Sequence, residues 1–259
     1  MNLTAFALLL AASLGASRTR LPDAAARDRS ERSEPAGQGR GAAEGERFKS
    51  DKAAVHFLEA LKPAEAREDA HLSGLWSEAQ TKVLTHVLES GAAEAKAGGR
   101  PTLVFDIHDT LEQIDVAGVR KGSPEIPGTP GGPEFVKAAL AKGIRVIVLS
   151  NTVETQRALE TSILQKLGYP VGDDHVTVMF KPDAKAEAWR DSDVWKGKAA
   201  RIIASTGIHV IAHLDDKREN LDAMSKSFPD SLPLQMAMDG PGALPGKGNA
   251  AKLRDLRIE

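Results

Sequence analysis

The chain has 259 residues with 34 Lys or Arg and 36 Asp or Glu, so its formal net charge is −2. This near-neutral charge argues against a protein that bulk electrostatics hold on nucleic acid. The absence of cysteine excludes disulfide frameworks, Cys-ligated zinc and thiol nucleophiles. Hydrophobic residues make up 41% of the chain but aromatic residues only 4%, so we expect a core of mainly aliphatic side chains.

The first fifty residues differ in composition from the rest. Residues 5–16 form an apolar run that is shorter than the roughly 20 residues of a bilayer span and is typical of a secretory signal. We therefore expect a signal peptide at 1–17 and a periplasmic or secreted protein. The start lacks the usual basic residue, and the alternative is an apolar tail on a cytoplasmic protein. Mixed charge with Gly, Pro and Ser predicts a disordered linker at 18–50, before a folded domain at 51–259.

Two helices are expected at the beginning of the folded domain. Apolar residues between Val55 and Leu61 mark the first, and those from Leu75 to Leu88 recur at spacings of three and four and mark the second. From residue 101 onward, strand and helix patterns alternate. Strands are predicted at 103–105, 144–149, 176–180, 208–214 and near 234–236, and helices at 135–140, 154–167, 195–205 and 219–227. This rhythm predicts an α/β fold with a central parallel sheet covered by helices on both faces.

Polar residues gather where the predicted strands end, and ligands of such sheets bind at the carboxyl ends of the strands. Carboxylates from two strand ends can share a Mg²⁺ ion, and a lysine and a hydroxyl can hold the oxygens of a phosphoryl group. An aspartate in such a site can attack phosphorus and form an aspartyl-phosphate. The candidate site residues are Asp106, His108, Ser150, Asn151, Lys196, Asp215 and Asp216.

At these residues the sequence resembles the haloacid dehalogenase-like (HAD) phosphohydrolases, and among them the secreted acid phosphatases of the bacterial class C and plant vegetative-storage-protein type. The resemblance covers roughly 73–240. It rests on the stretches VFDIHDTL, PGTPGGPEFVKAALAKGIRVIVLSNT and LETSILQKLGYP, and on the Asp215-Asp216 pair. Lys196 lies 11 residues before Gly207 and 20 before Asp216, which matches the family's spacing.

The resemblance implies a three-layer, Rossmann-like HAD domain with a minimal cap, preceded by helices. It implies Mg²⁺-dependent hydrolysis of small-molecule phosphomonoesters, with Asp106 as nucleophile and metal ligand. Phosphoryl binding falls to Lys196, Ser150 and the neighbouring Asn151. The remaining metal ligands would be Asp216, supported by Asp215, and the backbone carbonyl of His108. No nucleic-acid or membrane partner is favoured, and the oligomeric state is left open.

One position departs from the family pattern, because His108 stands where the family has its acid/base aspartate. Histidine can carry protons near neutral pH and can replace the aspartate. A nearby Mg²⁺ disfavours the imidazolium form, so a catalytically weak or inactive protein that binds a phosphorylated ligand or a partner is the alternative. A polynucleotide 3′-phosphatase is a second alternative, suggested by the Asp-Asp pair.

Three further points stay open at the level of sequence. Lys198 competes with Lys196 for the role of phosphoryl-binding lysine. Ser150 and Asn151 have an alternative role as the cap of the following helix. The segment between Leu111 and Pro130 is too short for a large cap domain, which predicts an open site.

Overall fold

The computed structural model describes residues 48–61, 66, 68–113, 127–182, 192–237 and 251–258. The predicted signal peptide and nearly all of the predicted linker lie outside these residues, as does most of the short segment expected in place of a cap. Among the described helices, none combines the length and the apolar character that a membrane span requires.

Six parallel strands form one sheet in the order β3-β2-β1-β4-β5-β6. Their bounds are β1 Pro101–Phe105, β2 Arg145–Val153, β3 Val176–Lys181, β4 His209–Asp215, β5 Leu232–Met236 and β6 Ala251–Leu253. In the register, Phe105 at the end of β1 pairs with Val148 on one side and with Leu214 on the other. The residue that follows Phe105 therefore lies between the ends of β2 and β4.

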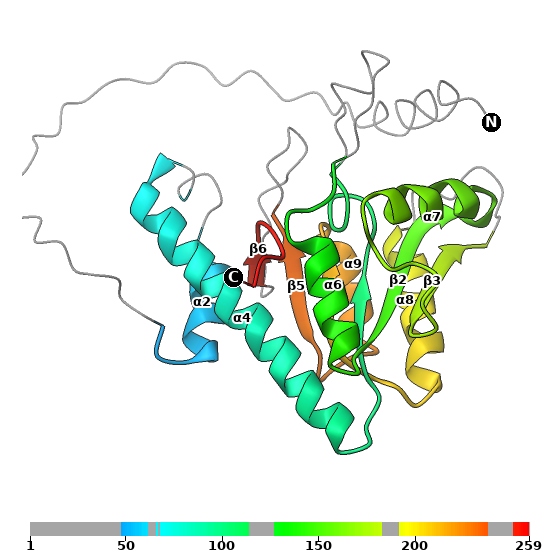
Figure 1. Ribbon diagram of the computed structural model, residues 1–259, viewed down its shortest axis with the longest axis horizontal. Coiled ribbons are helices and arrows are strands. Elements are labelled where there is room, and N and C mark those ends of the chain that lie inside the picture. The colour runs from blue at the N-terminus through cyan, green and yellow to red at the C-terminus, as the bar shows by residue number, and fades with distance from the viewer. Residues whose placement is uncertain are drawn as a thin grey trace, which may run out of the picture. The chain divides into compact units, whose positions relative to one another are not determined.

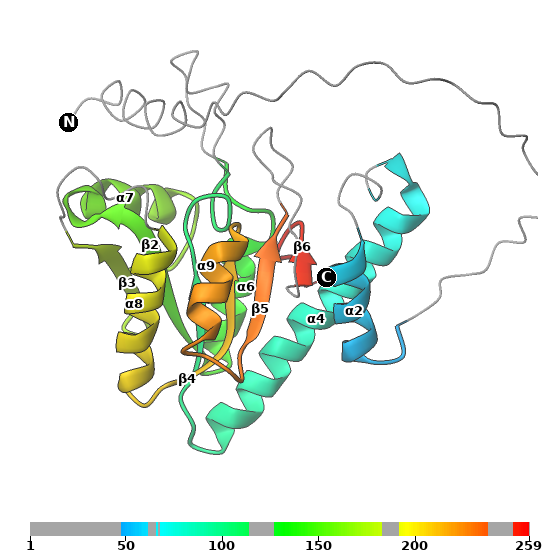
Figure 2. The ribbon, with the colours of Figure 1, turned by 180° about the vertical axis from the view of Figure 1, so that it is seen from behind.

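Helices cover the sheet on both faces and make three layers, as predicted (Figures 1 and 2). The helices of this layer system are α6 Gly132–Ala141, α7 Arg157–Lys166, α8 Ser192–Ser205 and α9 Arg218–Ser225. Side chains alternate along each strand, so that Leu103 and Phe105 of β1 join the core under α6, whereas Val104 joins the core under α8 and α9. Figure 1 shows α6 in front of the sheet, and Figure 2 shows α8 and α9 on the opposite face.

The helices α2 (Asp51–Ala60) and α4 (Ala70–Lys96) pack together. α2 contacts β6 at one edge of the sheet, whereas α4 contacts α6 and the central strands β1 and β4. The end of the chain is tied to α4, because the side-chain amide of Gln80 donates to Asp255 and its carbonyl oxygen accepts from the Arg254 backbone at 3.1 Å. The Arg254 guanidinium also lies 5.4 Å from the ring centre of Trp76. These contacts join the segment after β6 to α4.

The predicted elements are confirmed, and two differences have physical causes. The helix predicted at 154–167 begins as a 3₁₀ turn, η1 (Glu154–Gln156), because β2 runs on to Val153 and leaves no side-chain cap for the helix start. The strand β6 was not predicted, because three residues carry no periodic pattern and this strand exists only through its pairing with β5.

Candidate active site

A tight turn after β1 sets the position of Asp106. The backbone N–H of Asp106 donates to the Leu214 carbonyl at 2.9 Å and so continues the ladder toward β4. The next carbonyl, of Ile107, accepts the backbone N–H of Leu111 at 2.8 Å, which folds the chain back on itself. Asp109 occupies the left-handed region with φ 54°, an uncommon conformation for a residue other than glycine. The turn leaves the Asp106 carboxylate at the carboxyl edge of the sheet.

Lys196 is completely buried, and its ammonium group joins three strands of the sheet. It donates to Asp106 Oδ1 at 2.6 Å, to Asp215 Oδ2 at 3.1 Å and to the Leu149 carbonyl. The side chain comes from the second turn of α8, on the face that packs against the sheet. Burial alone would lower the pKa of Lys196, but the carboxylates of Asp106 and Asp215 outweigh it and raise the pKa above its usual value. The lysine therefore stays positively charged.

Three carboxylates meet beside this lysine. One oxygen each of Asp106, Asp215 and Asp216 lies within 4.8 Å of the others. Burial raises the pKa of Asp216 well above its usual range, and the neighbouring carboxylates of Asp215 and Asp106 add to this. The ammonium groups of Lys196 and Lys217 face three carboxylates, and a divalent cation would compensate the negative charge that remains. An all-oxygen donor set of this kind fits Mg²⁺.

Asp215 is held rigidly within the cluster. Its Oδ1 accepts from the Lys217 backbone at 2.9 Å and from the Asn220 side-chain amide at 2.9 Å, while its Oδ2 accepts from Lys196. Asp216 is less buried, and its backbone carbonyl accepts from the Gln235 side chain at 3.0 Å. These contacts leave the Asp216 carboxylate better placed than that of Asp215 to meet a ligand from outside.

Ser150 and Asn151 lie one strand away from Asp106, directly after the Leu149 carbonyl that accepts from Lys196. The buried Ser150 hydroxyl accepts from the Thr152 backbone at 3.1 Å, and its carbonyl accepts from the Trp195 indole at 2.9 Å. Neither residue caps a helix, because β2 continues past both. Asn151 Oδ1 is buried and has no hydrogen-bond partner among the described residues. Both residues remain available to bind a ligand at this edge.

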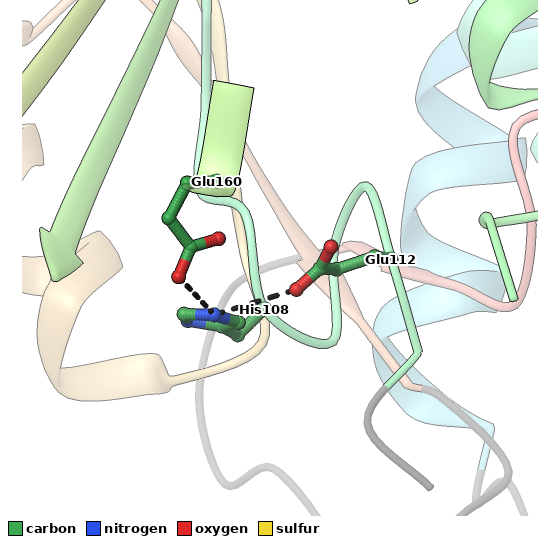
Figure 3. A group of neighbouring side chains, drawn as sticks. All are labelled: His108, Glu112 and Glu160. Carbon is green, nitrogen blue, oxygen red and sulfur yellow. Dashed lines mark ion pairs between the residues drawn. The ribbon is translucent and has the colours of Figure 1, made fainter. Parts of the chain in front are cut away.

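The Nε2 atom of His108 faces two buried glutamates, Glu112 and Glu160 (Figure 3). This atom is 3.3 Å from Oε1 of Glu112, in the same turn, and 3.4 Å from Oε1 of Glu160, on α7. Burial lowers the pKa of His108, but the carboxylates of Glu160 and Glu112 outweigh this and raise it to about 9. Burial raises the pKa of Glu112 to about 7, and the positive His108 only partly opposes this.

The sequence pattern predicts His108 as a site residue but neither of the two glutamates. Glu112 lies four residues after His108, and this spacing in a turn was the only available signal. Glu160 lies 52 residues after His108 in a helix of ordinary amphipathic pattern, and only the packing of α7 brings it to the site. The competing Lys198 is exposed on α8 and lies away from the aspartates that Lys196 contacts.

A hollow of about 350 Å³ lies at the opposite, amino end of the strands. Its walls include Thr102 from the start of β1, Arg145 from the start of β2 and Ile203 from α8. None of the candidate site residues borders this hollow, so the chemistry at the carboxyl edge is separate from it.

No protein-family model and no curated protein matches the chain. Solved structures similar to it include the class C acid phosphatase from Bacillus anthracis, at 15% identity and TM-score 0.36, over 58% of this chain and 72% of that one. The same enzyme with tungstate bound gives a TM-score of 0.35 at 15% identity and the same coverage. A phospho-aspartyl intermediate analogue of phosphoserine phosphatase gives 0.39 at 16% identity, over 61% of this chain and 96% of that one. The roles of residues in this chain rest on its own geometry.

Proposed function

We propose that the protein is a Mg²⁺-dependent phosphomonoester hydrolase of the HAD type that works through an aspartyl-phosphate at Asp106. The observation that carries the proposal is the cluster of Asp106, Asp215 and Asp216 around the buried ammonium of Lys196. It lies at the carboxyl edge of a parallel sheet, where ligands of such folds bind. A nucleophilic carboxylate, a fixed cation and a set of oxygen ligands are the parts that phosphoryl transfer needs.

In this proposal each residue has a separate task. Asp106 attacks phosphorus, and the bond from phosphorus to the ester oxygen breaks as the new bond forms. The ammonium of Lys196 stabilises negative charge on the phosphoryl oxygens, assisted by Ser150 and Asn151. When bound, Mg²⁺ would be held by Asp106, Asp216 and the His108 carbonyl, and it would neutralise phosphate charge. Asp215, which the lysine already engages, orients the cluster.

His108 supplies the proton that the departing ester oxygen needs. It lies two residues after Asp106, and the flanking carboxylates of Glu112 and Glu160 keep its imidazole protonated at neutral pH. After the first step the neutral imidazole can take a proton from the water that cleaves the aspartyl-phosphate, which returns both groups to their starting state.

The test is release of phosphate from a generic aryl phosphate between pH 5 and pH 8, with Mg²⁺ and with EDTA. We expect wild type to turn over only with Mg²⁺, and Asp106→Asn to abolish turnover while the exposed control Asp193→Asn retains it. Turnover by wild type in EDTA, together with turnover by Asp106→Asn, would contradict the proposal.

A second candidate function is favoured by the ion pairs of His108 with two buried glutamates, which can hold the imidazole away from a leaving group. The protein would then bind a phosphorylated ligand without cleaving it. The variant His108→Asp separates the two functions. Absence of phosphatase activity in wild type, together with a gain of activity in His108→Asp, would support the function of a protein that binds a phosphorylated ligand without cleaving it.

The location proposed from residues 1–17 is periplasmic or secreted. A scavenging acid phosphatase with an open site and broad substrate range suits such a location. Fractionation of cells that express the full-length chain with a C-terminal tag would test it, because an exported protein is recovered outside the cytoplasm in a shortened form.

A further inference from the structure

A second group of metal-ligating side chains lies beside the aspartate cluster and uses none of its side chains. It consists of His108 and Glu112, in the turn after β1, and Glu160, on α7. Figure 3 shows both carboxylates pointing at the same end of the imidazole ring. Three ligand atoms, one from each residue, lie within 4.8 Å of one another. The group therefore converges on one small volume.

The distances within this group suit a shared ion better than direct hydrogen bonds. Nε2 of His108 is 3.3 Å from Glu112 Oε1 and 3.4 Å from Glu160 Oε1. Hydrogen bonds between an imidazolium and a carboxylate are shorter, at about 2.7–2.9 Å. Tetrahedral coordination with bonds of about 2.0–2.1 Å places neighbouring ligand atoms about 3.3–3.4 Å apart.

The side chains of the group also carry polar atoms without a partner. Glu160 is fully buried and Glu112 is 1% exposed. Among the described residues, neither oxygen of Glu160, nor Glu112 Oε2, nor His108 Nε2 has a hydrogen-bond partner. A buried carboxylate that lacks partners is costly, and in native proteins such a group usually meets a counter-ion or a metal. Glu160 Oε1 has the long ion pair with His108 at 3.4 Å and no hydrogen bond, and Oε2 has no hydrogen bond among the described residues, so this buried carboxylate points to a ligand that the three side chains share.

We propose that His108, Glu112 and Glu160 bind a divalent cation of the zinc type through Nε2 and one oxygen of each carboxylate. One imidazole and two carboxylates suit Zn²⁺ or a related transition metal, whereas Mg²⁺ and Ca²⁺ take oxygen ligands. Two carboxylates balance the charge of the ion. Three protein ligands leave a fourth position for water or a ligand.

The three side chains differ in their exposure to solvent. The His108 side chain is 23% exposed, while the side chains of Glu112 and Glu160 are 2% and 0% exposed. A cation can thus enter past the imidazole and reach the buried carboxylates. The two metal sites share no donor atom, because the Mg²⁺ ligands of the proposed phosphatase are other side chains and the backbone of His108. A cation on Nε2 would displace the proton that His108 carries in that proposal, so we expect the zinc-loaded form to be inactive as a phosphatase.

The test uses the full-length protein, stripped of metal and then titrated with Co²⁺ or Zn²⁺ in an excess of Mg²⁺ that occupies the aspartate cluster. Tetrahedral Co²⁺ gives a strong visible absorption that octahedral Co²⁺ lacks. We expect wild type to develop this absorption at one Co²⁺ per chain and to lose it when Zn²⁺ is added. Glu160→Gln should weaken Zn²⁺ binding by more than the roughly 10–100-fold that loss of a supporting outer-shell group costs. The control Glu154→Gln, at an exposed glutamate just before α7, should bind Zn²⁺ as wild type does.

A measurement on wild type alone protects the test against a variant that fails to fold. X-ray absorption of the Zn²⁺-loaded protein should give four nitrogen or oxygen neighbours at about 2.0–2.1 Å, with the outer-shell scattering of one imidazole. The proposal is overturned if Zn²⁺ binding survives Glu160→Gln but disappears in Asp216→Asn, or if wild type binds no Zn²⁺ in excess Mg²⁺. Metal binding is measured without substrate, so the result does not depend on whether the protein is active as a phosphatase.

Discussion

Lys196 brings a positive charge into the interior, and its three acceptors determine whether that charge is tolerated. The ammonium bonds to Asp106, to Asp215 and to the Leu149 carbonyl, so all three of its protons have acceptors. The same contacts align the ends of β1, β2 and β4. In our proposal Lys196 therefore has two roles, because it takes part in phosphoryl transfer and also holds the site together. Its effects on activity and on stability must be measured separately in each variant.

The variant Lys196→Met should lose both activity and stability. It leaves Asp106 and Asp215 buried without their counter-charge, and breaking a buried ion pair from one side costs about 3–5 kcal/mol. The free energy of unfolding from denaturant titration checks this expectation. Lys198→Met on the exposed face of the same helix is the control, and it should stay within about 0.5 kcal/mol of wild type. An unfolding free energy of Lys196→Met equal to that of the control would contradict the role of this ion pair.

At the scale of elements, the helix α4 packs closely against the sheet at Gly91. This helix runs from Ala70 to Lys96 and buries one face against the sheet. A Cβ added at Gly91 would lie 2.6 Å from Ile144 Cδ1 and 2.7 Å from Ile211 Cδ1, so the helix lies close to the sheet there. At Gly74, near the exposed start of the same helix, a Cβ would meet nothing within 4 Å. The two glycines lie in the same helix, but only Gly91 is packed tightly against other side chains.

Alanine at these two glycines should have opposite effects on stability. Gly74→Ala should stabilise the protein by up to about 1 kcal/mol, because alanine favours the helix and finds free space. Gly91→Ala gains the same propensity but must displace two isoleucines, and overpacking typically costs about 1–3 kcal/mol. Thermal unfolding of both variants beside wild type measures the difference. Equal shifts of Tm in the two variants would show that the contact at Gly91 is not tight.

At the scale of the whole described domain, two cores lie on the two faces of the sheet. The core under α8 and α9 includes Leu221, Met224 and Phe228, and the buried His213 of β4 lies against it. His213 Nδ1 pairs with the Ser231 hydroxyl at 2.7 Å and Nε2 with the Ser225 hydroxyl at 3.0 Å. Burial lowers the pKa of His213 to about 4, a small opposing contribution coming from the Leu221 carbonyl. This core therefore contains a histidine that must stay neutral.

The pKa of His213 predicts that the folded protein loses stability in acid. Between pH 6.5 and pH 4 the unfolded chain binds a proton at this residue and the folded chain does not, so stability is full above pH 6.5 and declines below it. The shift of the pKa from its ordinary value of 6.5 to about 4 corresponds to a loss of roughly 3 kcal/mol. Denaturant unfolding at several pH values in EDTA measures this decline. His213→Gln should flatten the curve over that interval, and an unchanged slope would contradict the assignment.

Much of the fold followed from local pattern, because periodicity and apolar runs are properties of neighbouring residues. The alternation of strands and helices after residue 101 requires a parallel sheet, and a parallel sheet brings its carboxyl ends to one edge. Asp106, Lys196, Asp215 and Asp216 could be named from sequence for this reason. The position of each of these residues relative to the predicted elements already shows which strand end or helix it belongs to.

Only the tertiary structure decided the surroundings of His108, the pairing of β6 and the fit of α4. Glu160 meets His108 through the packing of α7 over the turn after β1, and no local pattern records a contact between residues so far apart. β6 has three residues and depends on β5 for its hydrogen bonds. Long-range contacts of this kind arise from shape and burial, whereas sequence patterns report only which face of an element is apolar.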